Sequence, residues 1–98
     1  MNTFMSISLD EQEPLLVTLA NGEDQVVGQF LPGAQAALGL MRVHRVIWDE
    51  KSDAYDLVPW PAHGDDSKVV VIPAHNIGAW SLPSPKLLAT YRRVCGLD

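Results

Sequence analysis

Residues 14–20 carry the clearest alternating pattern in the chain. Val17 and Leu19 are separated by a polar residue, and this period of two is typical of a strand with one buried face. Pro14 is expected to begin the strand, where a missing N–H group is tolerated. The following pair, Asn21-Gly22, predicts a turn because both residues accept positive φ angles. The segment therefore predicts a strand that ends in a turn.

Apolar stretches bounded by polar or turn-forming residues predict further strands over residues 25–31, 43–49, 55–60, 68–72 and 77–82. Gly28 is expected to bend the first of these strands, because glycine has no Cβ atom to obstruct a sharp corner. The Ala- and Leu-rich residues 34–41 are compatible with a helical turn or with an irregular excursion, and the pattern does not decide between them.

The end of the chain changes to a helical period. Ser84 is a suitable N-cap and Pro85 a suitable first helical residue. Arg92 and Arg93 fall in the last turns, where cations complement the helix dipole, and Gly96 is expected to end the helix. One apolar stripe consists of Leu87, Leu88, Tyr91, Val94 and Cys95.

These elements predict a mainly β protein. Five or six short strands and one helix within 98 residues favour a small, strongly bent, five-stranded barrel with a C-terminal helix. We expect an N-terminal arm over residues 1–13, the barrel over residues 14–83 and the helix over residues 84–96.

Composition limits the classes of function and the cellular compartments to be considered. The formal net charge of -5 works against phosphate binding, which requires cations. The single cysteine, Cys95, excludes an intrachain disulfide and favours a reducing compartment. No signal peptide is recognisable at the start of the chain, and no apolar run approaches the ~20 residues that span a bilayer. We therefore expect a cytoplasmic protein that does not interact with membranes.

Two short motifs resemble those of the Sm-like (LSm) family. Residues 19–22, followed by a strand containing Gly28, are similar to the first Sm motif, and residues 70–77 resemble the second. The order of residues 57–60, 72–77 and 83–91 resembles small Sm-like proteins of tailed phages, notably cyanophages. The resemblance implies an Sm-like, SH3-like barrel and a homo-oligomeric ring of about five to seven subunits. For a viral protein, the expected location is the host cytoplasm.

In rings of this family, the fourth strand of one subunit adds to the fifth strand of the next. This arrangement would also cover apolar strand edges that otherwise promote aggregation. The interface residues expected on this basis are Tyr55, Leu57, Trp60, Val69, Val70 and Val71.

The resemblance also implies RNA binding as a function, but the second motif departs from the family pattern. Pro73-Ala74 replaces the usual basic residue and glycine of the second motif. The candidate RNA-binding residues are His75 and Asn76 in the following turn, with Arg42 and Arg45 as the best basic cluster. Alternatively, His75 and Asn76 hold the turn, and the arginines are solvated surface charges.

No catalytic, metal or cofactor motif is recognisable. His44, His63 and His75 match no zinc spacing with Cys95, and no nucleophile elbow is present. Two hypotheses follow. The first is a non-enzymatic Sm-like ring protein that binds RNA or another polyanion weakly through turn residues near its pore. The second is a homo-oligomeric adaptor or assembly module that binds a phage or host protein and no nucleic acid.

Overall fold

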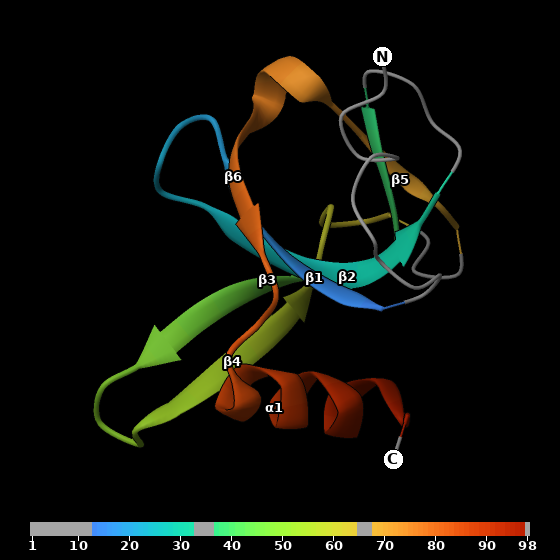
Figure 1. Cartoon of the computed structure of the whole chain (residues 1–98). Helices are drawn as coiled ribbons and strands as arrows, with labels where there is room; N and C mark the ends of the chain where they lie inside the picture. Colours follow the sequence, from blue (N-terminus) through green and yellow to red (C-terminus); the bar gives the residue numbers. More distant parts are fainter. Residues whose placement is uncertain (1–12, 33–36, 65–67, 98) are drawn as a thin grey trace.

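A computed structural model describes residues 13–32, 37–64 and 68–97. Six strands and a C-terminal helix make up this part of the chain (Figure 1). The elements are β1 (Pro14–Leu19), β2 (Gln25–Leu31), β3 (Ala37–Asp49), β4 (Ala54–Pro59), β5 (Val70–Pro73), the 3-10 helix η1 (Ala74–Asn76), β6 (Ile77–Ser81) and α1 (Pro85–Cys95). The N-terminal arm expected over residues 1–13 lies outside the described residues, apart from Glu13.

The strands form one antiparallel sheet in the order β4-β3-β2-β1-β6, with β5 paired to β3 beside this path. β3 is long enough to have two partners on the same side: its beginning, from Ala37 to Leu40, pairs with β5, and its end, from His44 to Asp49, pairs with β4. The prediction of a mainly β protein with a C-terminal helix is confirmed. The sheet has six strands rather than five and is not closed into a barrel, because no described ladder joins β5 to β6.

Gly28 marks an irregularity between β2 and β3, as its position within a strand predicts. The register shifts between Val27 and Gln29. A Cβ atom on Gly28 would lie 3.0 Å from Val43 Cγ2 and 3.1 Å from the carbonyl oxygen of Met41. Only glycine allows the two strands to approach so closely without a shift of the neighbouring atoms.

The undecided segment 34–41 contains the beginning of β3 from Ala37 onward; residues 33–36 lie outside the described part. Leu38 and Leu40 are buried there and pack in the core, which explains why this Ala- and Leu-rich stretch is a strand despite its helical propensity. The core cluster consists of Leu15, Val17, Val26, Phe30, Leu38, Leu40, Val43 and Ile72, and Trp60 and Trp80 pack partly against it.

Helix α1 has the predicted caps. The Ser84 hydroxyl accepts a hydrogen bond from the Leu87 N–H at 3.2 Å, and Gly96 adopts a left-handed conformation with φ of 68°. Leu87 and Tyr91 are buried, whereas Val94 at the end of the predicted stripe is exposed. The helix packs beside β4 (Figure 1). None of the helices in the described ranges is long and apolar enough to cross a membrane.

Candidate interaction surface

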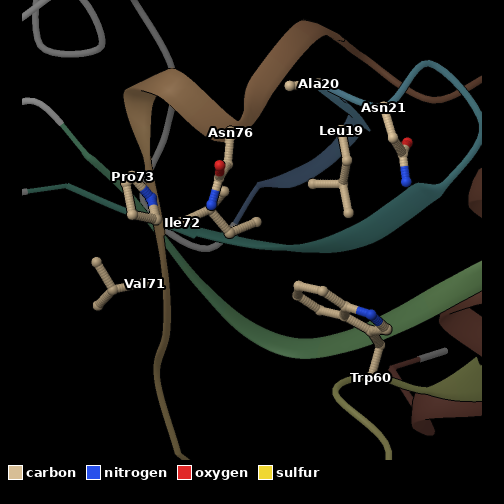
Figure 2. Close-up of a pocket in the computed structure, with 8 residues that line it drawn as sticks. All are labelled: Leu19, Ala20, Asn21, Trp60, Val71, Ile72, Pro73 and Asn76. Atoms are coloured by element: carbon tan, nitrogen blue, oxygen red, sulfur yellow. The ribbon is translucent and has the colours of Figure 1, made fainter.

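A pocket of about 280 Å³ lies near the end of β5, beside η1. Figure 2 shows Trp60 on one side of the pocket, with Leu19, Asn21 and Asn76 pointing toward it from the other. Its lining residues are Leu19, Ala20, Asn21, Trp60, Val71, Ile72, Pro73 and Asn76. They come from the end of β1, the following turn, the residue after β4, the strand β5, and η1.

The turn between β1 and β2 forms one rim of this pocket, and local hydrogen bonds hold it in place. Asn21 Oδ1 accepts hydrogen bonds from the N–H groups of Glu23 (2.9 Å) and Asp24 (3.1 Å), and Asn21 Nδ2 donates to Asp24 Oδ2. Gly22 has a φ of 75°, as the predicted turn requires. The Ala20 N–H donates to the carbonyl oxygen of Asn76 at 2.7 Å, which ties η1 to the end of β1.

The chemistry of the pocket is that of a binding surface. Aliphatic side chains, a proline ring and an indole form its apolar walls. The side-chain amides of Asn21 and Asn76 add polar groups to the lining. None of the lining residues in the described ranges has a side chain that ionises near neutral pH. Among the described residues, no group of three His, Cys, Asp or Glu side chains could hold a metal ion.

Three strand edges lack a partner within the described part of the chain, one each on β4, β5 and β6. Val69, which precedes β5, and Val71 are 51% and 58% exposed, which is far from a core position. On β6 the exposed residues are Gly78, Ala79 and Ser81, which are small and uncharged. Neither β5 nor β6 carries a charged side chain, although exposed edges are usually protected by charges.

The four candidate RNA-binding residues do not gather at one place. Asn76 lines the pocket and His75 is exposed beside it in η1. Arg42 is half-buried and donates through Nη1 to Gln29 Oε1 at 2.9 Å. Arg45 forms an ion pair with Asp24, with 3.3 Å between Nη2 and Oδ1. Both arginines therefore interact within the subunit, and neither lines the pocket.

The six candidate interface residues fall into two groups. Tyr55 and Leu57 are half-buried on β4, where the Tyr55 ring packs edge-on against Trp48 at 4.9 Å between centroids. Trp60 and the three valines from Val69 to Val71 lie instead at the pocket or along β5. Val70 packs partly against the core, so Val69 and Val71 are the exposed members of this second group.

A buried polar cluster on the opposite side was not predicted. The Tyr91 hydroxyl donates to the carbonyl oxygen of Arg42 at 2.9 Å, and His44 Nδ1 donates to the same oxygen at 2.9 Å. Burial raises the pKa of Tyr91 well above its usual value, with a further contribution from nearby Cys95. Arg42 has a φ of 51°, in the left-handed region, which is uncommon for an arginine and could not be predicted from the residue type.

Comparisons with known proteins add little to this description. No family model and no curated protein matches the chain. Among solved structures, the chain is similar to one chain in the crystal structure of the NatC complex bound to CoA, with 18% identity and a TM-score of 0.49. The match covers 81% of this chain and 86% of that chain. A likeness at this level carries no argument about fold or function.

Proposed function

We propose that the protein is a non-enzymatic, homo-oligomeric assembly module whose subunits join by strand addition. In this proposal, β6 of one subunit pairs with β5 of the next. The observation that carries it is the pair of uncharged strand edges on β5 and β6, neither of which has a partner among the described residues. Unprotected edges of this kind are templates for pairing with another chain.

The third terminal edge, on β4, is less suited to strand addition. Pro59 at its end has no N–H group to donate, and Asp56 places a charge in the middle of the strand. Helix α1 also packs beside this strand. We therefore assign the contact to β5 and β6 rather than to Tyr55 and Leu57 of β4.

A contact between two different edges is heterologous, and it generates a ring if the rotation between subunits closes. The resemblance of residues 19–22 and 70–77 to the Sm motifs supports a ring. The absence of a second cysteine in the sequence is compatible with assembly in the cytoplasm. A ring of this kind would present its remaining surface to a protein partner, of phage or host origin if the resemblance to phage proteins holds.

Weak RNA binding through His75 and Asn76 is the second candidate function. Both residues lie in η1 at the edge of the pocket. The net charge of -5 and the internal interactions of Arg42 and Arg45 make this candidate weaker. Binding of a labelled oligonucleotide that falls steeply as salt rises would support it, because each phosphate contact releases counterions. No binding at low salt would exclude it.

Replacing Val71 with lysine tests the assembly directly. Val71 is exposed on β5, so Val71→Lys should leave the fold intact while placing a charge in the proposed contact. We expect the mass of the parent protein, measured by light scattering, to correspond to a discrete oligomer and the mass of the variant to a monomer. Val94→Lys is the matched control, because Val94 is similarly exposed but lies on α1.

Two results would contradict the proposal. A parent protein that remains monomeric at all accessible concentrations would exclude self-assembly. A Val71→Lys variant with the same oligomeric mass as the parent would exclude β5 as the contact. Circular dichroism of both variants should match the parent, which separates a lost contact from a lost fold.

A further inference from the structure

We infer that the pocket beside η1 binds a proline-rich peptide that carries a lysine or arginine next to its prolines. The lining in the described ranges is neutral and consists of aliphatic side chains, a proline ring, an indole and two carboxamides. Such a lining favours an uncharged, largely apolar group, because burying a charge without a partner is costly. The volume of about 280 Å³ is small for a ligand pocket, so it suits a ring or two of a peptide rather than a whole cofactor.

Trp60 provides the surface on which a proline ring can pack. Its backbone N–H donates to the carbonyl oxygen of Val43 at 3.0 Å, and its side chain packs partly against the core. The indole is therefore held in place while part of it lines the pocket (Figure 2). Grooves lined by aromatic side chains are a recurring site for peptides in the polyproline II conformation. Proline is already restricted to this conformation, so a proline-rich peptide loses little conformational entropy on binding.

The two carboxamides of the lining differ in what they offer to a peptide. Asn21 is engaged in its own turn, where its Oδ1 accepts from the N–H groups of Glu23 and Asp24. Among the described residues, no hydrogen bond engages the carboxamide of Asn76, which points into the pocket from the side opposite Trp60 (Figure 2). Its Nδ2 can donate to a carbonyl oxygen of the peptide.

Pro73 makes an extended, strand-like peptide less suitable at the pocket. It is the last residue of β5 and has no N–H group to donate. A peptide that adds to a sheet needs a series of N–H and C=O partners along the strand edge. The backbone of a polyproline II peptide is solvated and needs only isolated hydrogen bonds. One free carboxamide beside an apolar wall meets the second requirement.

The charge of the rim determines which residues should flank the prolines. Glu23 is exposed in the same turn as Asn21, and neither ion pair of the described ranges involves it. The formal net charge of the chain, -5, has the same sign. A lysine or arginine beside the prolines would be attracted to this rim, whereas an acidic residue would be repelled. The inference does not rest on the proposed assembly, because Trp60 and Asn76 lie outside β5 and β6.

An NMR titration with a blocked peptide tests the inference. The probe is an oligoproline of about six residues, two turns of a polyproline II helix, followed by one arginine. The chain has three tryptophans, whose indole N–H signals can be assigned separately. We expect the signals of the Trp60 indole and the Asn76 carboxamide to shift. The Trp48 indole, which packs against Tyr55 and does not line the pocket, should keep its position.

Substitutions at the rim measure the contribution of each group. Asn76→Ala removes the carboxamide but keeps the backbone carbonyl oxygen that accepts from the Ala20 N–H. We expect its Kd for the peptide to rise about fivefold to tenfold, as for the loss of one hydrogen bond. His75→Ala is the matched control, because His75 is exposed in η1 and does not line the pocket. Glu23→Gln should raise the Kd of the arginine peptide about twofold to threefold and leave that of an all-proline peptide unchanged.

Three results would overturn the inference. The first is a Trp60 signal that does not move at the highest soluble peptide concentration. The second is an equal shift of the Trp48 and Trp60 signals, which would indicate non-specific association. The third is an equal Kd for the parent and Asn76→Ala. A single-stranded RNA oligonucleotide that moves the Trp60 and Asn76 signals when the peptide does not would assign the pocket to RNA instead.

Light scattering of the same samples separates this inference from the proposed assembly. A monomeric parent that binds the peptide would support the peptide site and contradict only the assembly. A discrete oligomer whose Trp60 signal does not respond to the peptide would contradict only the peptide site.

Discussion

The two sides of this molecule differ in how far their side chains are buried and how far their strand edges are covered. On the side covered by α1, Tyr91 is fully buried and its hydroxyl donates to the Arg42 carbonyl oxygen. On the side of the pocket, Val69 and Val71 are more than half exposed, and the strands β5 and β6 each have an edge that no described residue covers. The helix thus completes one side of the sheet, whereas nothing in the described part of the chain completes the other.

The two sides differ because burial, and not exposure, requires that polar groups be paired. Buried polar groups must be paired, and in the described residues no buried side-chain nitrogen or oxygen lacks a hydrogen bond. Exposed apolar side chains and free strand edges carry no such requirement in a monomer, but they favour association. We therefore expect substitutions on the α1 side to change the free energy of unfolding and substitutions on the β5 side to change binding.

Tyr91→Ala should produce the largest loss of stability. Removing a fully buried aromatic side chain leaves a cavity, and we expect the free energy of unfolding to fall by about 3–5 kcal/mol. Val71→Ala, on the other side, should change it by less than about 0.5 kcal/mol in the monomer, because the side chain is mostly exposed. Urea denaturation of both variants measures the contrast. Similar losses in the two would show that the two sides do not differ in this way.

Gly28→Ala should have the next largest effect. The added Cβ atom would lie 3.0 Å from Val43 Cγ2, so the strands must shift, at a cost of about 1–3 kcal/mol in the free energy of unfolding. Gly22→Ala provides a useful control: no atom lies within 4 Å of its Cβ position, but its φ of 75° is unfavourable for alanine. We expect about 1 kcal/mol there. An unchanged denaturation midpoint for Gly28→Ala would mean that β2 and β3 are not held at this close approach.

Local signals in the sequence predicted the elements whose structure is determined locally. The strand 14–19, the turn at Asn21-Gly22 and the caps of α1 each depend on residues close together in the chain, and all are confirmed. The beginning of β3 was not predicted, because its Ala- and Leu-rich sequence suits a helix equally well and only burial against the other strands decides the outcome.

The candidate site was harder to predict for a related reason. Its pocket combines residues from Leu19, Trp60 and β5, which are distant in sequence and come together only through the sheet topology. The sequence identified Trp60 and the β5 valines as interface candidates, but it grouped them with Tyr55 and Leu57, which lie on β4. The role of Arg42 was also not predicted, because its side chain suggested a surface cation, whereas its carbonyl oxygen accepts hydrogen bonds from two buried side chains, His44 and Tyr91.

Tyr91→Phe should have a smaller effect than Gly28→Ala near neutral pH and a distinctive effect at alkaline pH. Loss of the hydrogen bond to the Arg42 carbonyl oxygen is expected to lower the free energy of unfolding by about 1 kcal/mol at pH 7. Burial raises the pKa of Tyr91 in the folded protein, so above pH ~10 the unfolded chain loses this proton while the folded protein retains it.

The stabilising contribution of the raised pKa is therefore complete below pH ~10 and is lost as pH rises above it, by about 1.4 kcal/mol for each pH unit. Denaturation from pH 7 to pH 11 should show this decline in the parent and in Tyr55→Phe, but a smaller one in Tyr91→Phe. Tyr55 is the suitable control because it lies on β4 and is only half-buried. If Tyr91→Phe declines as steeply as the parent, another group is responsible for the alkaline loss, and the buried hydroxyl does not distinguish the α1 side in the way proposed here.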